Sequence, residues 1–265
     1  MSASTLIADS IVLARRNLAH VRQLPEKLLD VTLQPIMFVL LFAFVFGRVI
    51  AVPDGNYREY LLGGILVQTL GFGIMGPAVS IATDLREGVV DRLRTLPMAR
   101  SAYLIGHVVA ELAAVMIGVT IISLTGLLIG WGIYSDLPHA IAGYGLVLLF
   151  AFAMTWCGTL LGMLVRTPYA AQGMVFMIVF PATFLATTFV PITGFEGVLH
   201  TLAAWNPISA LSAAVRTLFG NPTATPADAP WPLLHPITVS IIGCLAIIAI
   251  TVPITIRLFR VRTDS

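Results

Sequence analysis

Residues 60–83, YLLGGILVQTLGFGIMGPAVSIAT, form an uncharged run between Glu59 and Asp84, and this run decides the fold. The hydrocarbon core of a bilayer is about 30 Å thick, and a helix needs about 20 apolar residues to cross it. The run therefore predicts a membrane-spanning helix. The whole chain agrees, because 58% of its 265 residues are hydrophobic and only 11% are charged, against about 25% in soluble domains. This composition excludes a soluble enzyme and a disordered chain.

Similar runs with few or no charges recur along the chain and predict an all-α membrane protein with six spans. We place these spans at about 31–52, 60–83, 102–133, 140–165, 167–192 and 237–257, within a transmembrane domain at 30–265. Residues 197–215 are also uncharged, but Asn206 and Pro207 in their middle argue against a seventh span. We expect a short helix from Pro207 to Phe219 instead, because proline is favoured in the first turn of a helix.

The basic residues indicate that both termini lie in the cytoplasm. Positive charge is retained on the cytoplasmic side of membrane proteins. With an inner amino terminus, six spans put all but three of the 15 Lys and Arg residues in cytoplasmic segments, and the exceptions are Arg48, Arg58 and Arg216. A seventh span would move the carboxy-terminal arginines to the wrong side, so an even number of spans is favoured.

Residues 1–29 predict an amphipathic helix that lies on the inner leaflet. Apolar residues recur there at the spacing of one helical face: Ile7, Ile11, Ala14, Leu18 and Val21. Arg15 and Arg22 flank this face, as in helices at a membrane interface, and Pro25 is expected to end the helix. A soluble helix packed on a partner protein is the alternative. The segment has no continuous apolar core, so it does not resemble a cleavable signal peptide.

The most charged stretch, DLREGVVDRLRTLPMAR at residues 84–100, joins the second and third spans inside the cell. Its leucines and valines recur at the spacing of one helical face. An amphipathic helix with charges of both signs is suited to docking into a groove of a soluble protein, whereas a solvated loop with scattered ion pairs is the alternative. The candidate docking residues are Asp84, Leu85, Arg86, Glu87, Val89, Asp91, Arg92, Leu93, Arg94 and Pro97.

The sequence lacks the motifs of nucleotide hydrolysis and of metal chemistry. A phosphate-binding loop requires Gly-Lys followed by Ser or Thr, and the only lysine, Lys27, stands between Glu26 and Leu28. No HExxH or GxSxG motif and no metal-ligand spacing is present. Cys157 and Cys244 lie in apolar stretches and indicate no redox site. We therefore expect no catalytic residue, metal site or cofactor in this chain, and no nucleic-acid partner.

His107 and Glu111, one turn apart on the third span, are the ionisable pair nearest to membrane depth. Ionisable residues inside a span are functional candidates. The pair lies close to the cytoplasmic end of its span, however, so a structural role through mutual pairing, or through pairing with a neighbouring arginine, is the alternative. Two such ligands do not make a zinc site.

The second and fifth spans carry stripes that are candidates for the walls of a translocation path. Glycines in the second span permit close helix packing, and Pro77 and Pro181 are expected to bend these two spans. Aromatic stripes also face lipid or the protein core in membrane proteins, which is the alternative here. The candidate path residues are Gln68, Phe72, Met75, Phe176, Phe180, Phe184 and Thr188.

Four segments resemble the permease subunits of type 2 ATP-binding-cassette (ABC) exporters, in particular the daunorubicin- and multidrug-resistance branch. They are LPEKLLDVTLQPIMFVLLFAFVFG at 24–47, YLLGGILVQTLGFG at 60–73, DLREGVVDRLRTLPMARSAYLIG at 84–106 and WNPISALSAAVRTLFGNP at 205–222. The loop that ends in Leu-Pro-Met-Ala-Arg is the most specific of them. The resemblance implies an amino-terminal interfacial helix, six spans, a coupling helix between spans 2 and 3, and short outer helices before span 6.

The resemblance also implies partners. In this family two permease chains pair, as identical or different copies, and each sits on a cytoplasmic ABC ATPase, so that two ATPase copies bring the ATP and Mg. It implies a multi-pass protein of the bacterial cytoplasmic membrane that contacts lipid and exports a hydrophobic drug, lipid or glycolipid. Closure of the ATPases is then expected to push the helix at 84–97 and to open a cavity between the permeases by alternating access.

Three other functions are to be distinguished from this one. A proton-coupled secondary transporter needs a buried carboxylate, for which Glu111 is the candidate, and inverted repeats, of which we see none. A lipid-modifying enzyme needs a catalytic constellation. A membrane scaffold would alter assembly, but not export, when it is lost.

Overall fold

The computed structural model describes residues 25–47, 49–53, 55–89 and 100–264. Every regular element in these ranges is a helix, which confirms the all-α class. Most of the predicted interfacial helix, residues 1–24, and most of the predicted coupling helix, residues 90–99, lie outside the described residues.

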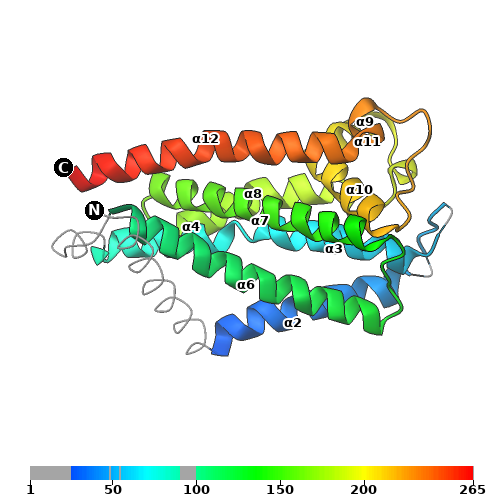
Figure 1. Ribbon diagram of the computed structural model, residues 1–265, viewed down its shortest axis with the longest axis horizontal. Helices are drawn as coiled ribbons and strands as arrows, with labels where there is room; N and C mark the ends of the chain where they lie inside the picture. Colours follow the sequence, from blue (N-terminus) through cyan, green and yellow to red (C-terminus); the bar gives the residue numbers. More distant parts are fainter. Residues whose placement is uncertain (1–24, 48, 54, 90–99, 265) are drawn as a thin grey trace.

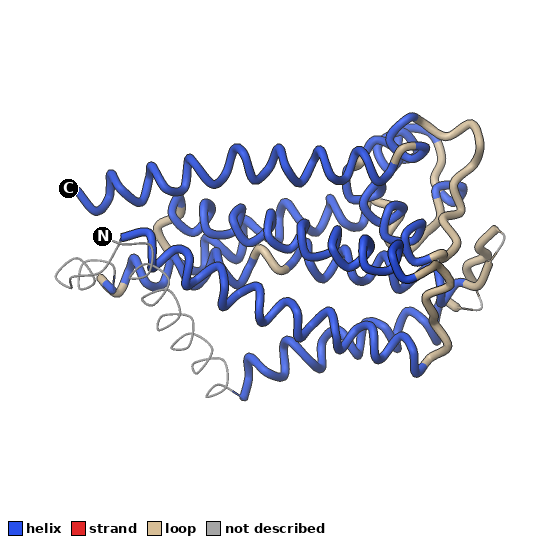
Figure 2. Tube along the Cα trace, viewed as in Figure 1, coloured by secondary structure: helices blue, strands red, loops and turns tan. Residues whose placement is uncertain are grey.

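The long helices run side by side along the longest axis of the molecule (Figure 1), and most of the loops gather at one end (Figure 2). The long helices are α2 (Pro25–Leu41), which continues into the π-helical turn η1 (Phe42–Phe46), α3 (Tyr57–Phe72), α4 (Met75–Arg86), α6 (Arg100–Leu128), α7 (Leu137–Leu164), α8 (Pro168–Phe184) and α12 (Pro236–Asp264). The short helices are η2 (Ile192–Gly194), α9 (Gly197–Trp205), α10 (Pro207–Phe219) and α11 (Trp231–Leu234). They lie at the end with the loops, and α12 finishes at the opposite end (Figure 1).

Four helical segments in the described part of the chain are long and apolar enough to cross a membrane. They are Tyr57–Arg86, Tyr103–Leu128, Leu137–Leu164 and Pro236–Val261. The helices α9 and α10 pass the same test only as a pair, and they meet at 63°, so they form either a broken span or a re-entrant loop. Two further apolar helices, Leu33–Phe46 and α8, are shorter. The chain is thus a multi-pass membrane protein, and its described part has four candidate spans by this measure, or five if the bent pair counts as one.

The second predicted span consists of two helices in line. Gly73 and Ile74 separate α3 from α4. The amide of Gly73 still bonds back to the carbonyl oxygen of Thr69, at 2.9 Å. Pro77, one turn further on, has no amide hydrogen to offer to the carbonyl of Gly73. The series of backbone hydrogen bonds along the helix is therefore interrupted one turn before the proline.

The fifth predicted span is shorter than expected, because α8 ends at Phe184 and not near residue 192. The amide Nδ2 of Asn206 donates hydrogen bonds to the carbonyl oxygens of Ala182 and Leu185, at 2.7 and 3.1 Å. The last carbonyls of a helix need partners from outside the helix. Here Asn206, at the corner between α9 and α10, supplies these hydrogen-bond donors. The helix α8 can therefore end at Phe184.

The helix α10 has the bounds that the sequence predicts. The side chain of Asn206 caps its first turn by accepting a hydrogen bond from the amide of Ile208, at 2.9 Å, and Pro207 is its first residue. Gly220 ends it in the left-handed conformation, with φ of 71°. Residues 209–216 are all buried, so α10 packs inside the end of the bundle and does not lie on its surface.

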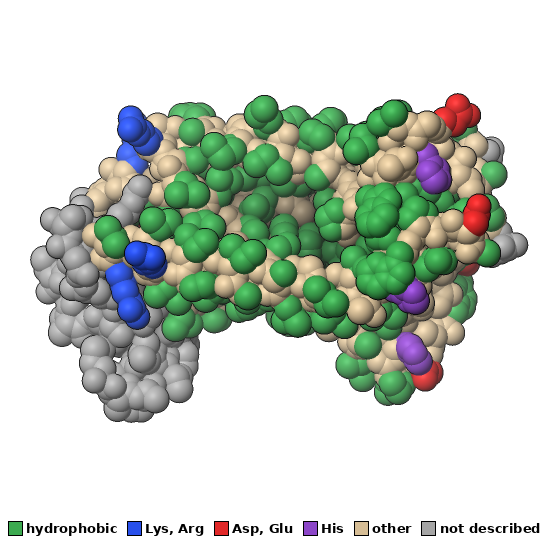
Figure 3. All heavy atoms as spheres, turned by 90° about the horizontal axis from the view of Figure 1, so that it is seen from above, with side chains coloured by type: hydrophobic (Ala, Val, Ile, Leu, Met, Phe, Trp, Pro, Cys, Tyr) green, Lys and Arg blue, Asp and Glu red, His purple; other side chains and the backbone are tan. Residues whose placement is uncertain are grey.

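Charged side chains gather at the two ends of the molecule (Figure 3). On the face shown, the basic ones lie at the end where α12 finishes, and the acidic ones and the histidines lie at the opposite end. Hydrophobic side chains cover the length between them (Figure 3). We call the basic end the inner end and the other the outer end, after the orientation that the distribution of basic residues predicts.

The helices α4 and α7 meet through glycines. A Cβ atom at Gly158 would overlap the carbonyl oxygen of Ile74, and one at Gly162 would overlap that of Ala78. Only glycine lets the two backbones approach so closely. Gly145, on the same helix, has no atom within 4 Å of the place that its Cβ would take.

Replacing Gly158 with alanine is expected to destabilise the protein, because the added methyl group must push α7 away from α4. Overpacking of this kind costs about 1–3 kcal/mol. Thermal unfolding of the purified protein in detergent measures the loss, with Gly145→Ala as the control on the same helix. Equal melting temperatures of the two variants would contradict the contact between α4 and α7.

Candidate functional site

The inner ends of α4, α6 and α12 are joined at the base of the predicted coupling loop. The hydroxyl of Tyr103 on α6 donates a hydrogen bond to the carboxylate of Asp84 on α4. The ring of Tyr103 stacks on that of Phe259 on α12, with centroids 5.8 Å apart. We call Asp84, Tyr103 and Phe259 the inner anchor. It fixes the helix that enters the loop and the helix that leaves it to each other and to the last helix of the chain.

The structure describes part of the predicted docking segment. Leu85 is half-buried and packs against the apolar cluster around Tyr103 and Phe259. Arg86 and Glu87 are exposed, and Val89 is half-buried. Asp91, Arg92, Leu93, Arg94 and Pro97 lie outside the described residues. Leu85 therefore contributes to the packing of its own chain, whereas Arg86 and Glu87 are accessible to a partner.

His107 and Glu111 follow Tyr103 at successive turns of α6. His107 is only 3% exposed, and its ring stacks on that of Tyr103 with centroids 6.4 Å apart. Glu111 is half-buried, and a Cβ atom at Gly76 of α4 would lie 2.9 Å from its Oε2 atom. The carboxylate of Glu111 thus packs against α4, on the inner side of the midpoint of the span Tyr57–Arg86. His107 thus continues the ring stacking of the inner anchor into the span, and Glu111 lies one turn further along α6.

The predicted aromatic stripes of α3 and α8 meet. The rings of Phe72 on α3 and Phe176 on α8 have centroids 6.2 Å apart. Along α8 the rings of Phe176, Phe180 and Phe184 stack in sequence, with centroids 5.1 and 4.3 Å apart. Phe72 of the predicted stripe in the second span therefore joins the predicted stripe of α8 in one row of rings, which we call the aromatic ladder.

The aromatic ladder continues through two residues that the sequence analysis does not single out. The ring of Phe189 lies 5.4 Å from that of Phe184 and stacks on that of Phe42 in η1, at 4.2 Å. Phe176, Phe180 and Phe184 are 52%, 40% and 39% exposed. The part of the ladder on α8 is thus an open aromatic surface of the described chain, whereas Phe42 and Phe72 are half-buried and Phe189 is buried. Phe42 carries no distinctive signal, because phenylalanine is ordinary in an apolar helix.

The other predicted path residues are less exposed in the single chain than the rings of α8. Gln68 is 4% exposed within α3. Met75 is half-buried and packs on the cluster that joins α4 to α8. Thr188 is fully buried, and its hydroxyl donates a hydrogen bond to the carbonyl oxygen of Thr183, at 3.0 Å. The structure places Thr188 in a different cluster, at the outer end.

A buried arginine holds this outer end together. The side chain of Arg216 on α10 is 0% exposed. Its Nε atom donates a hydrogen bond to the carbonyl oxygen of Tyr60, at 2.7 Å, and its Nη2 atom donates one to that of Thr188, at 2.9 Å. The guanidinium carbon lies 3.5 Å from the centroid of the Tyr60 ring, a cation–π contact. We call Arg216, Tyr60 and Thr188 the outer clamp.

The outer clamp holds its cation without a carboxylate partner among the described residues. Backbone carbonyl oxygens and the face of an aromatic ring take that place. The hydroxyl of Tyr60 donates a further hydrogen bond to the carbonyl oxygen of Thr187, at 2.6 Å. The helix α3 is therefore bound to the turn after α8 twice, once directly through Tyr60 and once through Arg216.

Two glycines of α3 make room for the outer clamp. A Cβ atom at Gly64 would overlap the carbonyl oxygen of Thr188 and would lie 2.9 Å from Nη2 of Arg216. A Cβ atom at Gly63 would lie 2.8 Å from Cγ of Arg216. Real Cβ atoms do not approach other atoms so closely, so a larger residue at either position must displace the arginine or the turn.

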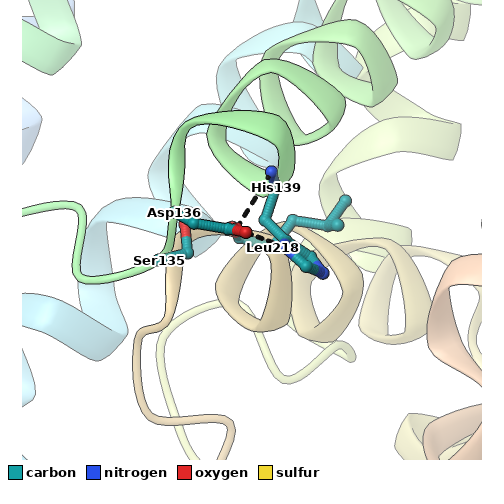
Figure 4. A network of polar contacts seen from close by, with 4 residues as sticks. All are labelled: Ser135, Asp136, His139 and Leu218. Atoms are coloured by element: carbon teal, nitrogen blue, oxygen red, sulfur yellow. Dashed lines mark hydrogen bonds and ion pairs between the residues drawn. The ribbon is translucent and has the colours of Figure 1, made fainter.

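The loop between α6 and α7 is fastened to α10 at the outer surface (Figure 4). The hydroxyl of Ser135 donates a hydrogen bond to the carbonyl oxygen of Leu218, at 2.6 Å. Asp136 caps α7 by accepting a hydrogen bond from the amide of His139, at 3.3 Å, and its carboxylate also contacts the His139 ring (Figure 4). This hydrogen bonding from His139 lowers the pKa of the Asp136 carboxyl group. The position of α10 is thus fixed from the solvent side as well.

In the sequence, Arg216 stands out only as an exception to the distribution of positive charge. A usable signal lies in α10 itself, where one helical face carries the small or polar residues Ser209, Ser212, Ala213 and Arg216. Such a face points to a packed interior around the arginine. Its partners could not be identified, because Thr188 and Tyr60 lie 28 and 156 residues away in the sequence.

The chain is similar to known membrane proteins over most of its length. The profile of the family described as "ABC-2 type transporter" matches residues 10–219. The daunorubicin resistance ABC transporter permease protein DrrB1 of Streptomyces coeruleorubidus is 25% identical over 259 residues, which are 97% of this chain and 88% of that protein. The doxorubicin resistance ABC transporter permease protein DrrB of Mycobacterium tuberculosis is 23% identical over 74% of this chain and 68% of its own. The putative transport permease ycf38 of Cyanophora paradoxa is 23% identical over 81% and 75%.

Removing the hydroxyl of Tyr103 is expected to destabilise the inner end. Tyr103→Phe loses the hydrogen bond to the carboxylate of Asp84 but keeps the ring that stacks on Phe259, so the loss is about 1–3 kcal/mol. Asp84→Asn removes the charged acceptor, and the double variant is expected to lose less than the sum of the two single losses. Unfolding in detergent measures these differences, with Tyr169→Phe at an 81% exposed position as the control. Strictly additive losses would show that the two side chains do not interact.

Proposed function

Since the chain belongs to the ABC-2 type transporter family, we propose that it works as the permease subunit of an ATP-driven exporter in the bacterial cytoplasmic membrane. Two permease chains and two copies of a separate cytoplasmic ATPase form the complex, and the ATPases bring the ATP and Mg. The cargo is a hydrophobic or amphipathic compound. The names of the drug-resistance relatives favour a drug, with a lipid or glycolipid as the alternative. The inner anchor carries the proposal, because it joins the base of the loop between α4 and α6 to the spans.

The proposed topology has six spans with both termini inside. It adds α2 with η1, and α8, to the four long apolar segments, and it treats the bent pair of α9 and α10 as a re-entrant element on the outer side. The 17 residues of α8 give a helix of about 25 Å, which a slight local thinning of the bilayer accommodates. The basic inner end and the acidic outer end support this orientation (Figure 3).

In the proposed mechanism the ATPase acts on the loop at residues 84–100. A partner shifts a conformational equilibrium only if it binds the two conformations with different affinity. Moving a permease from 1% to 99% outward-facing takes about 5.5 kcal/mol of such a difference, and the ATP-loaded ATPase pair is its source. Asp84 and Tyr103 flank the loop and are joined by a hydrogen bond. A displacement of the loop is therefore passed to α4, α6 and α12 together.

We assign the aromatic ladder to the wall of the path between the two permeases. Its rings on α8 are exposed in the single chain, so that a second permease facing this surface would enclose them. Aromatic contacts contribute about 0.5–1.5 kcal/mol each beyond the burial of apolar area, which suits flat apolar cargo. Gln68 is buried in this conformation, and it joins the wall only if α3 moves. Met75 is half-buried.

Proton-coupled transport is the second candidate, because Glu111 is a half-buried carboxylate within a span. Its packing against Gly76 favours a structural role under our proposal. In vesicles loaded with daunorubicin, export is expected to require both the ATPase and ATP, and Glu111→Gln is expected to change its rate only modestly. Full export by the permease alone, or its complete loss in Glu111→Gln with normal assembly, would favour proton coupling.

The ATPase is expected to co-purify with the tagged permease and to be released by negative charge in the loop. The double variant Val89→Asp, Leu93→Asp tests this, because carboxylates on the docking face of the loop are poorly accommodated in an apolar groove. Leu85 is left unchanged, since it packs on its own chain. Val198→Asp, at a 75% exposed position of α9, is the matched control. If the double variant retains as much ATPase as the control, the loop is not the docking site.

A further inference from the structure

A single span connects the inner anchor with the outer clamp. The helix α3 carries Tyr60 near its outer end, and α4 carries Asp84 near its inner end. At each end a polar contact binds the span to other helices: to Arg216 of α10 outside and to Tyr103 of α6 inside. Any displacement of this span is therefore applied to both contacts.

The outer clamp brings three segments together. Arg216 comes from α10, Tyr60 from α3, and Thr188 from the turn between α8 and η2. A further hydrogen bond joins α10 to the turn directly, because the amide of Thr187 donates to the hydroxyl of Ser209, at 2.9 Å. The three segments are thus connected pairwise by buried hydrogen bonds, and Arg216 and Tyr60 each contact both of the other two segments.

We propose that Arg216 is a positioning residue for transport, which makes α10 and the turn at 185–191 move together with α3. A displacement of α4 at the inner end then reaches the outer end of the bundle through one body. This inference rests on the proposed function, since it needs a motor that displaces α4.

The physical reason is the burial of the guanidinium. A charge in apolar surroundings is stable only while its hydrogen-bond partners stay in place. Separating α10 from α3 would take away the carbonyl oxygen and the ring of Tyr60 at once. Moving the three segments as a unit keeps every one of these contacts. The alternative to joint movement is that the outer clamp opens during the transport cycle. Water would then reach Nη1 of Arg216, which has no hydrogen-bond partner among the described residues.

The first experiment separates transport from ATP hydrolysis. In the reconstituted complex with its ATPase, Arg216→Gln is expected to lower daunorubicin export at least about tenfold, since hydrogen bonds to a charged donor are lost. Basal ATP hydrolysis is expected to stay within about twofold, because the inner anchor is untouched. Arg216→Lys keeps the charge and is expected to restore part of the export. Wild-type export by Arg216→Gln would overturn the proposal.

A pair of glycine variants tests the clamp without removing the arginine. Gly64→Ala is expected to reproduce the loss of export, because the new methyl group would overlap the carbonyl oxygen of Thr188. Gly71→Ala, on the same helix, is the control, since its Cβ would lie 3.5 Å from Val179 and Thr183, an ordinary contact. If Arg216→Gln does not fold, this pair decides: equal export by the two alanine variants would overturn the proposal.

The second experiment observes the joint between α10 and its neighbours. Ser212 is buried on α10, one turn before Arg216. In a background with Cys157→Ala and Cys244→Ala, a Ser212→Cys variant is expected to resist a membrane-impermeant maleimide with and without ATP. Adding Gly64→Ala is expected to expose it, and Thr201→Cys, at an exposed position of α9, is the positive control for labelling.

The outcomes distinguish this inference from the proposed function. Labelling of Ser212→Cys only when ATP is present, in an otherwise unchanged permease, would show that the clamp opens during transport and would overturn the inference while leaving the exporter intact. Absence of any ATP-dependent export in the unchanged permease would instead refute the proposed function. Resistance to labelling that Gly64→Ala abolishes, together with lost export, supports the positioning role.

Discussion

The guanidinium of Arg216 must keep its partners, and the outer end of the protein is arranged around that requirement. Uncompensated burial of a charge costs several kcal/mol, and Arg216 has only carbonyl oxygens and a ring to offset this cost. The carbonyl of Thr188 can accept from it because α8 has already ended at Phe184. Gly63 and Gly64 leave space for the side chain. Three features thus allow the buried guanidinium to keep its hydrogen-bond partners. They are the early end of α8, the glycines of α3 and the inward position of α10.

The two ends of the span Tyr57–Arg86 are held by different chemistry, and the difference follows from their surroundings. At the inner anchor a phenol donates to the carboxylate of Asp84, which is half-buried and lies at the end of its helix. At the outer clamp neutral carbonyls replace the carboxylate, so that no second charge needs to be buried. Between the two, the break at Gly73 and Ile74 divides the span. Hydrogen bonds from the amide of Gly73 to the carbonyl oxygen of Thr69 and from that of Ala78 to Ile74 continue across the break, so the two helices still form one span between the two contacts.

The sequence alone was sufficient for the features that depend on local chemistry. The uncharged runs predict the long helices, and Pro207 predicts where α10 begins; the structure adds Asn206 and Gly220 as its two caps. The end of α8 could not be predicted, because its carbonyls are satisfied by Asn206 from another helix. The inward packing of Leu85 depends in the same way on Phe259, far along the chain. The spacing of apolar residues and the composition of a segment contain no information about such distant partners.

Contacts with residues distant in the sequence also determine the bend between α9 and α10. By composition, α9 and α10 could form a seventh crossing, yet they bend by 63° at Asn206. The amide of Asn206 is committed to the end of α8, and Arg216 is committed to α3. A straight crossing would have to give up both sets of hydrogen bonds inside a membrane, where no water replaces them. It would also carry the basic end of α12 to the outer side, against the distribution of charge. Both costs support the topology that we propose, with α9 and α10 as a re-entrant pair and an even number of spans.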